Sequence, residues 1–299
     1  MQRKIIYIIN PISGTRTKTD LEKFVAKKTE AAKIPFRIFP SVANGDYRFL
    51  ESIIKKEKIT DIVIAGGDGT VSQVIGSLMH HDINFGIIPC GSGNGLAYAA
   101  KISRQPAKAL QTILKGKAAA VDGFYINGKF ACMLAGLGLD AKVAYDFTTQ
   151  SRRGLATYIK LVIKNFFAAK TFSFGLELKE IKLDVDAFFI SVANSNQFGN
   201  NFKIAPKASL HDGLLDIVIA TKQSKLGFFL RTFRQISGWS YLQTESLIKK
   251  NNGLIYFQTN SLTITNHSGA LVHIDGEPAE IQKKIKIEIR EKCFRLIQP

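Results

Sequence analysis

The sequence is poor in the residues that mark a secreted or metal-clustered protein. It has three cysteines, Cys90, Cys132 and Cys293, which form no C-x-x-C pair or other metal-binding spacing. So small and odd a number favours a reducing compartment. The amino terminus leads into an apolar segment that Pro11 ends, so it does not resemble a signal peptide. Residues 254–274 lie in the longest stretch without Asp, Glu, Lys or Arg, contain polar side chains throughout and indicate strands rather than a membrane span. We expect a cytoplasmic protein whose membrane contact is peripheral.

Acidic residues are also scarce. The 24 Asp and Glu residues face 41 Lys and Arg residues, which gives a formal net charge of +17. Such a charge favours an anionic partner, namely a nucleotide, an acidic lipid surface or nucleic acid. Nucleic acid is the weakest of these, because aromatic and basic residues are not interleaved as a stacking platform. The length of 299 residues and a hydrophobic content of 45% allow one large domain or two ordinary ones.

A Walker-type G-x-x-x-x-G-K-[ST] loop is absent, which excludes that class of ATPase. In its place, three short apolar runs each lead into a turn of small residues. The runs and turns are 5–9 with N-P-I-S-G at 10–14, 62–65 with G-G-D-G-T at 66–70, and 85–88 with P-C-G-S-G-N at 89–94. Glycine turns let backbone N–H groups approach a phosphate, and a following helix N-terminus favours its charge. Ligands of open α/β sheets bind outside the carboxyl ends of the strands, so the three turns should converge on one crevice.

The pattern of predicted elements changes near residue 120. Residues 1–121 alternate strand and helix, which predicts a mainly parallel sheet. Short β-rich runs follow, beginning with the hairpin signal Asn127-Gly128, and they predict an antiparallel sandwich. Two helical stripes interrupt them, at 155–167 and 226–239, each flanked by Lys and Arg. A basic amphipathic helix can lie on an anionic membrane, although such a stripe also suits core packing with solvated lysines.

The three turns, in this order and spacing, resemble the catalytic domain of diacylglycerol and sphingosine kinases, which includes soluble bacterial lipid kinases. The segments L-A-G-L-G-L-D-A at 134–141 and A-P-x-A-x-x-x-D-G-x-L-D at 205–216 extend this resemblance over nearly the whole chain. G-G-D-G-T by itself is shared with NAD kinases. The resemblance implies a Rossmann-like α/β domain at 1–121, rejoined by 285–299. It also implies a mainly antiparallel β-sandwich at 122–284 for the lipid and metal, with the active site in the cleft between the domains.

The resemblance also implies roles for single residues. ATP would be bound by eight of them: Asn10, Gly66, Gly67, Thr70, Gly91, Ser92, Gly93 and Asn94. Asp68 and Glu277 would serve as base or hydroxyl orienter, with no ranking between the two, and Asp122 would support the metal–phosphate site. Mg²⁺ would be held by the Asp212 carboxylate with the backbone carbonyls of Ser209 and Leu214, which are oxygen ligands of the kind a hard cation prefers.

Two positions depart from the family pattern. Gln73 stands where the family usually has Glu, and Gly95 stands where bacterial diacylglycerol kinases usually have Asp. A small residue at position 95 is closer to sphingosine kinases. Replacing the two carboxylates removes negative charge from the expected nucleotide and metal arrangement.

The expected function is an ATP-dependent lipid kinase that phosphorylates the hydroxyl of a membrane lipid alcohol, diacylglycerol or a sphingoid base. An NAD kinase-like enzyme and a non-catalytic nucleotide or lipid sensor are the alternatives. The expected partner is a lipid substrate at an anionic membrane surface rather than nucleic acid, and a homodimer is left open.

Overall fold

The computed structural model describes residues 2–13, 18–150, 155–178, 181–196, 204–236, 242 and 253–299. The chain divides into two compact units, which are described one at a time. Unit 1 comprises Met1–Val121 with Lys292–Pro299, and unit 2 comprises Asp122–Glu291. The chain runs from one unit into the other within strands β5 (Lys117–Ile126) and β15 (Lys284–Gln298).

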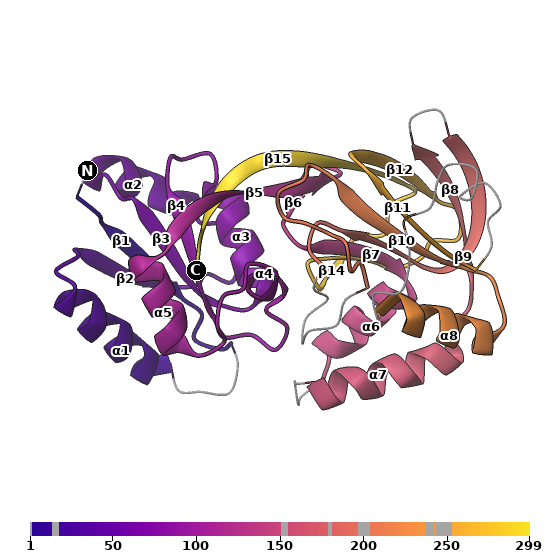
Figure 1. Ribbon diagram of the computed structural model, residues 1–299, viewed down its shortest axis with the longest axis horizontal. Helices are drawn as coiled ribbons and strands as arrows, with labels where there is room; N and C mark the ends of the chain where they lie inside the picture. Colours follow the sequence, from indigo (N-terminus) through magenta and orange to yellow (C-terminus); the bar gives the residue numbers. More distant parts are fainter. Residues whose placement is uncertain are drawn as a thin grey trace. The chain divides into compact units, whose positions relative to one another are not determined.

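Unit 1 is built on a parallel sheet in which the end of β15 is followed by β4, β3, β1 and β2 (Figure 1). The strands are β1 (Ile5–Ile9), β2 (Phe36–Pro40), β3 (Asp61–Gly66) and β4 (Asn84–Pro89). Every residue of β1 and β3 is buried, so both faces of the sheet are covered. Continuous apolar runs, rather than alternating ones, are what such doubly covered parallel strands require.

Helices alternate with these strands, as the sequence pattern predicts. They are α1 (Lys18–Ala31), the 3-10 turn η1 (Arg48–Leu50), α2 (Glu51–Glu57), α3 (Asp68–Leu78), α4 (Gly95–Ala99) and α5 (Pro106–Lys115). The carboxyl ends of the central strands are in register, with Ile9 opposite Ala65 and Gly66 opposite Pro89. The three small-residue turns therefore begin at the same edge of the sheet.

Unit 2 is an antiparallel assembly ordered β14-β13-β7-β9-β8-β12-β15, with β10 pairing both β9 and β11. Its further strands are β6 (Lys129–Ala131), β7 (Leu134–Gly138), β8 (Phe172–Leu178), β9 (Ile181–Ala193), β10 (Leu215–Thr221), β11 (Leu254–Thr259), β12 (Ser261–Asn266), β13 (Val272–Ile274) and β14 (Glu277–Ala279). Phe124, Phe174, Ile190 and Ile217 lie in its buried apolar core. The Asn127-Gly128 signal is a tight hairpin, in which Ile126 pairs with Lys129.

The strand that returns to unit 1 differs from the expectation in length and boundary. The resemblance implies a return at residue 285, whereas the units divide at residue 292, within β15. The reason is that β15 is one continuous strand of 15 residues. Its first part pairs antiparallel with β12 in unit 2, and only Arg295 and Leu296 pair with β4 in unit 1.

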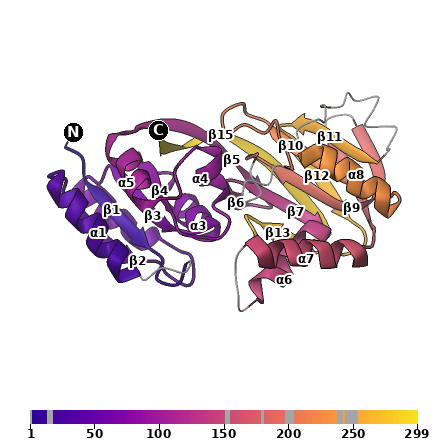
Figure 2. The same ribbon diagram turned by 60° about the horizontal axis from the view of Figure 1, so that its bottom comes forward.

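Helices α7 (Leu155–Ala168) and α8 (Lys225–Ile236) lie side by side on unit 2 (Figures 1 and 2). Phe166 and Phe228 stack with their ring centroids 5.0 Å apart, and the Lys225 ammonium donates to the Phe166 carbonyl at 2.8 Å. Part of each predicted stripe is therefore core packing. Residues 237–239, the end of the second predicted stripe, lie outside the described residues. In the described part of the chain no helix is long and apolar enough to span a membrane.

Candidate active site

The first two turns of unit 1 are tied together by Asn10 and Thr70. The Asn10 side-chain amide donates to the Thr70 hydroxyl at 2.8 Å, and the Asn10 backbone N–H donates to the Ala65 carbonyl at 2.9 Å. The Asn10 side-chain carbonyl accepts the N–H of Ile12 at 3.0 Å, which shapes the turn that follows β1. Both residues belong to the predicted nucleotide site, and here they hold one turn against the next.

Asp68 ties the second turn to the third. Its Oδ2 accepts the backbone N–H of Asn94 and its Oδ1 accepts that of Gly95, each at 2.7 Å. Hydrogen bonds to an ionised carboxylate are among the stronger ones in proteins. Asn94 has the left-handed φ of 59° and is the N-cap residue of α4, so the Asp68 carboxylate receives the first N–H groups at the start of that helix. The predicted catalytic carboxylate thus has a bridging role between two turns.

The same two turns touch through their glycines. A Cβ added at Gly91 would lie 2.6 Å from the Cα of Gly67, a distance that real Cβ contacts essentially never show. A Cβ at Gly67 would lie 3.2 Å from the Cα of Gly91. The sequence analysis attributed these glycines to the approach of a phosphate. The structure gives them a second reason, which is the direct packing of one turn's backbone on the other.

Asn94 closes the third turn on itself. Its side-chain carbonyl accepts the N–H of Gly91 at 2.9 Å, and its side-chain amide donates to the Gly91 carbonyl at 2.7 Å. Asn94 is 4% exposed, whereas Ser92 and Gly93 are partly exposed in the same loop. We call Asn10, Asp68, Thr70, Asn94 and the Gly67–Gly91 contact the loop frame. The side chains of the loop frame make these hydrogen bonds with one another and with the backbone of the turns, and so fix the shape of the loops.

The start of α3 lies within the loop frame and carries positive potential. The first N–H groups of a helix have no intrahelical acceptor. Gly67, the N-cap residue of α3, has no side chain that could accept a hydrogen bond from them. Gly66 packs tightly on the first turn of α3, since a Cβ there would lie 2.9 Å from that of Thr70. Aligned N–H groups and a helix dipole in one rigid turn can bind phosphate oxygens.

In unit 2, Glu277 stands next to a tight turn. Ile274 pairs with Glu277 across a two-residue turn formed by Asp275 and Gly276, which have positive φ angles of 48° and 83°. Two central residues with positive φ define the type I′ hairpin, for which Asp-Gly is a preferred pair. Glu277 itself is exposed.

Asp275 anchors this turn from below. Its Oδ1 accepts the N–H groups of Met133 and Leu134 at 3.0 and 2.9 Å, and its Oδ2 accepts that of Cys132 at 3.0 Å. The residue is 5% exposed. A carboxylate that is buried and holds three backbone donors is a structural anchor, which leaves the neighbouring Glu277 as the accessible acid of the turn.

A buried histidine supports the same turn. The Nδ1 of His273 accepts the N–H of Gly276 at 3.3 Å, so the proton of a neutral ring lies on Nε2, which donates to Asp140 Oδ2 at 3.1 Å. His273 is 2% exposed. A Cβ at Gly136 would lie 2.0 Å from that Asp140 oxygen, so only glycine fits beneath the pair. This explains one glycine of the L-A-G-L-G segment.

The predicted magnesium loop lies beside Asp122. The Asp122 Oδ2 accepts the N–H of Gly213 at 2.8 Å, and its own N–H donates to the Leu210 carbonyl at 2.8 Å. The Asp212 Oδ1 accepts the N–H of Leu214 at 3.1 Å. A Cβ at Gly213 would lie 2.9 Å from the carboxyl carbon of Glu291, so a third acid lies close to this loop.

The charges around this loop suit a cation. Partial burial raises the pKa of the Asp212 carboxyl, and the negative charge of Asp122 raises it further, against the lowering effect of the Leu214 N–H. A hard divalent cation would relieve that repulsion, and carboxylate and carbonyl oxygens are its preferred ligands. The residues present therefore fit the Mg²⁺ that the resemblance implies.

A second aspartate of the same motif is buried. Burial raises the pKa of the Asp216 carboxyl to about 6, although hydrogen bonds from the Tyr256 hydroxyl and the Gln258 amide lower it. The Tyr256 hydroxyl also accepts the N–H of Lys207 at 3.0 Å. Asp216 therefore helps to fix residue 207, within the A-P-K-A part of the motif, against β11.

The predicted residues fall into three groups. The structure brings together the nucleotide-binding set and Asp68 in unit 1, and Asp122 with the 209–214 loop in unit 2. Glu277 stands on a separate turn of unit 2. Their roles toward substrate stay predictions, as does the cleft between the domains. The sequence does not single out the supporting roles of Asp275 and Asp140, although the type I′ turn preference for Asp-Gly is a signal for the first.

Comparison with known proteins identifies the lineage of both units. Residues 4–126 match the family model of the diacylglycerol kinase catalytic domain. Residues 134–297 match that of the YegS C-terminal NAD kinase beta sandwich-like domain. The fold is shared with crystal structures from Bacillus anthracis str. Sterne, which cover 99% of this chain with TM-scores of 0.80 and 0.75 at 22% and 20% identity. The second of these is described as a diacylglycerol kinase.

Curated relatives agree with the domain models. A diacylglycerol kinase of Bacillus subtilis (strain 168) is 26% identical over 281 residues, which is 92% of this chain and 89% of that protein. An uncharacterised protein of Synechocystis sp. is 30% identical over 287 residues; the match covers 90% of this chain and 64% of the length of that protein. The chain belongs to the lipid kinase family that combines a diacylglycerol kinase catalytic domain with a YegS-type sandwich domain. Enzymes of this family are phosphotransferases that act on an alcohol group.

Proposed function

We propose that the protein transfers the γ-phosphoryl group of ATP to the hydroxyl of a membrane lipid alcohol, either a diacylglycerol or a sphingoid base. The observation that carries this proposal is the loop frame, in which Asp68 holds the second and third turns together by two hydrogen bonds of 2.7 Å. Phosphoryl transfer depends mainly on positioning and on stabilising negative charge. Rigid glycine turns at the N-terminus of α3 meet the first requirement for a triphosphate.

The proposed division of labour follows from exposure. Both carboxylate oxygens of Asp68 already accept backbone N–H groups, whereas Glu277 is exposed at a turn that Asp275 and His273 hold rigid. A general base must be free to approach the proton that it removes. We therefore assign the base to Glu277 and the shaping of the phosphate loops to Asp68, which ranks the two residues that the sequence left unranked.

The Mg²⁺ requirement is assigned to the 209–214 loop. Asp212 would hold the ion with the carbonyls of Ser209 and Leu214, and Asp122 would keep the loop in place through its bond to Gly213. When bound, Mg²⁺ supplies positive charge that neutralises neighbouring carboxylates. Asp122 acts in this scheme by positioning the loop.

The two departures from the family pattern are accommodated in unit 1. Gly95 is buried, and its N–H is one of the two that Asp68 accepts, so this position serves the loop frame rather than a second carboxylate. Gln73 is exposed on α3, and its side chain packs on Gly45, where a Cβ would lie 2.7 Å from the Gln73 Cδ. The loop frame is therefore complete without the two acids.

An anionic membrane surface is the proposed location of the substrate. Helices α7 and α8 expose large apolar side chains, which are Ile163, Phe167, Leu226, Phe229, Leu230 and Phe233, each between 54% and 73% exposed. Exposed basic residues lie on the same helices: Lys160, Lys164, Arg231 and Arg234. We call these ten residues the α7–α8 patch. Apolar side chains that enter the interface and cations that meet anionic headgroups are the two components of peripheral membrane binding.

The activity is tested with γ-labelled ATP and Mg²⁺ on three acceptors: diacylglycerol in vesicles, a sphingoid base in vesicles, and NAD in solution. One of the two lipids should take up the label while NAD does not. Labelled NAD would place the chain with NAD kinase-like enzymes. An absence of label in all three, from protein that still binds ATP, would favour the sensor alternative, and the double substitution Gln73→Glu with Gly95→Asp then tests whether the missing acids are the cause.

Membrane binding is tested by sedimentation with neutral and anionic vesicles at low and high salt. Phe229→Ser combined with Phe233→Ser should weaken binding to anionic vesicles several-fold, and high salt should weaken the wild type because screening reduces the attraction of the basic residues. Phe49→Ser is the matched control, since Phe49 is 47% exposed on unit 1. Equal binding of the wild type and the double variant would refute the α7–α8 patch as the docking surface.

A further inference from the structure

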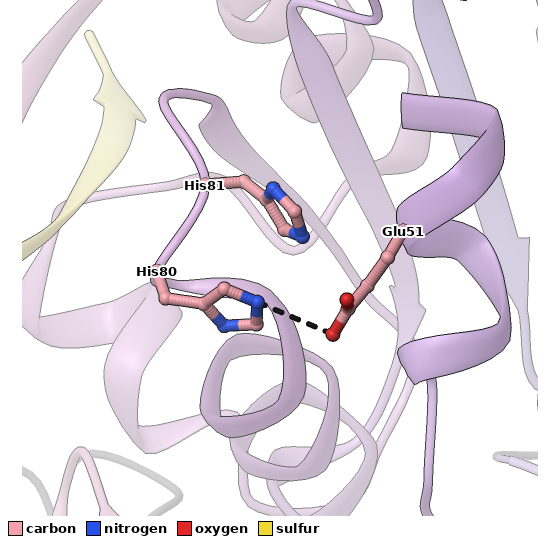
Figure 3. Close-up of side chains that lie close together, drawn as sticks. All are labelled: Glu51, His80 and His81. Carbon is pink, nitrogen blue, oxygen red and sulfur yellow. Dashed lines mark ion pairs between the residues drawn. The ribbon is translucent and has the colours of Figure 1, made fainter. Parts of the chain in front are cut away.

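Three side chains of unit 1 converge at the end of α3 that lies away from the glycine turns. His80 and His81 follow the last turn of α3, and Glu51 is the first residue of α2 (Figure 3). One ligand atom from each, a carboxylate oxygen and two imidazole nitrogens, lies within 4.8 Å of the other two. Of the five histidines in the chain, these two are adjacent in sequence. Among the described residues, Glu51, His80 and His81 are the one group of three or more metal-ligating side chains whose ligand atoms lie this close together.

We propose that Glu51, His80 and His81 form a site for a divalent transition metal of the zinc class, with water completing the coordination. Two imidazoles and one carboxylate are a ligand set that zinc uses in proteins. Nitrogen and oxygen donors bound to Zn²⁺ at 2.0–2.1 Å in a tetrahedron lie about 3.3 Å apart. His80 Nε2 and Glu51 Oε1 are 3.2 Å apart, so this pair already has the separation of two ligands on one ion.

His81 supplies the independent observation. Its Nε2 is buried and has no hydrogen-bond partner in the described structure. A buried polar atom without a partner is costly, and most native structures satisfy it with protein, water or an ion. Figure 3 shows the ring of His81 beside that of His80, on the side of the Glu51 carboxylate, with centroids 4.2 Å apart. The backbone holds this arrangement, because the His81 N–H donates to the Leu78 carbonyl at 3.0 Å and its carbonyl accepts the Ile83 N–H at 2.9 Å.

Two charged groups on α2, Glu51 and Lys55, interact electrostatically with the His81 ring. Glu51 supplies negative charge that offsets the repulsion between Lys55 and a bound cation.

The position of the cluster indicates what the metal would do. Helix α3 has 11 residues and is therefore about 16 Å long, and the loop frame lies at its other end. The ion would fasten the start of α2 to the turn after α3, since it links Glu51 to His80 and His81. The Glu51 and His80 side chains are 30% and 54% exposed, so tight packing does not fix their rotamers. Because this role is structural, the proposal does not rest on the proposed lipid kinase activity.

The test is a Zn²⁺ titration of the chelator-treated full-length protein, with excess Mg²⁺ present to occupy the 209–214 loop. Wild type should bind one Zn²⁺ per chain, and Zn²⁺ should raise the Tm because a ligand that binds only the folded state stabilises it. His80→Ala and Glu51→Gln should each weaken Zn²⁺ binding at least tenfold and abolish the Tm increase. Both side chains are partly exposed, so these variants should fold; circular dichroism checks this.

His267→Ala is the matched control. His267 is 46% exposed on unit 2 and lies 3.8 Å from Asp184, so the variant also removes a partly exposed histidine paired with an acid. Its Zn²⁺ affinity should equal that of the wild type. The proposal is overturned if His80→Ala and Glu51→Gln bind Zn²⁺ as tightly as the wild type, or if His267→Ala weakens binding as much as they do. Lipid kinase activity, present or absent, does not enter this readout.

Discussion

The two units use their acidic residues in opposite ways. In unit 1 the Asp68 carboxylate of the glycine turn accepts two backbone N–H groups and joins neighbouring loops. In unit 2 the supporting role falls to the buried Asp275, while Glu277 and Asp212 are exposed. The comparison indicates that a motif carboxylate can be required for shape in one unit and available for chemistry in the other. A sequence motif does not distinguish the two uses.

The largest effect is expected where the loops of unit 1 touch. Gly91→Ala introduces a Cβ 2.6 Å from the Cα of Gly67, and a backbone atom cannot move aside as a flexible side chain can. We expect the free energy of unfolding to fall by about 2 kcal/mol, as it does in overpacked cores. ATP binding should be lost as well. Thermal unfolding and an ATP titration measure the two effects.

Gly227→Ala is the control for Gly91→Ala. The Cβ of that variant would lie 3.1 Å from the Ser224 hydroxyl, which precedes α8 and accepts the Gly227 N–H. Alanine favours a helix over glycine by about 1 kcal/mol, so this control should be neutral or stabilising. If Gly91→Ala unfolds and binds ATP like the wild type, the direct packing of the two turns is not needed for the site.

An intermediate effect, on stability rather than binding, is expected for Asp216 in unit 2. Its folded pKa of about 6 is above the ordinary value of 3.8, so the folded state holds the proton more tightly than the unfolded one. The protonated carboxyl therefore contributes stability that is full below the ordinary pKa and is lost as the pH rises through about 6. Asp216→Asn removes this titration, so it should be more stable than the wild type at pH 8 by about 3 kcal/mol.

Denaturant unfolding from pH 4 to pH 8 measures this difference. Asp46→Asn is the control, because the Arg48 guanidinium holds the pKa of the exposed Asp46 at about 2, in the opposite direction. The stability that the Asp46–Arg48 pair contributes is present above the ordinary pKa of Asp and is lost as the pH falls through about 2. The control should therefore not change how the free energy of unfolding depends on pH between pH 5 and pH 8. If the free energy of unfolding of Asp216→Asn changes with pH as that of the wild type does, Asp216 ionises with an ordinary pKa.

The smallest effect is expected for the cation loop of unit 2. Mg²⁺ should raise the Tm of the wild type by a few degrees and should leave that of Asp212→Ala unchanged, since the variant lacks the one side-chain ligand. Without Mg²⁺ the variant should be no less stable than the wild type, because it removes repulsion with Asp122. Asp184→Ala, whose side chain is 88% exposed in the wild type, is the control and should keep the Mg²⁺ response. An identical Mg²⁺ response in Asp212→Ala would exclude this loop as the cation site.

Much of the fold could be predicted from local patterns. Buried parallel strands such as β1 have continuous β-branched runs, and the Asn127-Gly128 turn has a strong local signature. Helix α6 (Leu139–Thr148) was missed, because the glycine-rich segment before it was interpreted as one motif that continues into the helix. The full length of β15 was missed as well. Its alternation is interrupted at residues 290–292, which are all exposed, before the strand pairs with β4 in unit 1.

The residue types of the candidate site could be predicted from the sequence, but the contacts between these residues could not. The residue types and the turn positions follow from the three motifs. The bonds from Asp68 to the N–H groups of Asn94 and Gly95 join residues 26 and 27 positions apart, so they depend on how β3 and β4 align. The Glu51–His80 pair similarly requires α2 to lie beside the end of α3. Such contacts exist only once the tertiary structure is formed.

The most direct test of the contrast between the units is a paired measurement of Tm, ATP affinity and turnover for Asp68→Asn and Glu277→Gln. Asp68→Asn should lower stability by about 1–3 kcal/mol and weaken ATP binding, because its amide cannot accept both N–H groups. Glu277→Gln should keep the wild-type Tm and ATP affinity while turnover falls about a hundredfold or more, as expected when a general base is lost. The contrast is contradicted if Asp68→Asn retains wild-type Tm and ATP affinity, or if Glu277→Gln retains wild-type turnover on the preferred lipid.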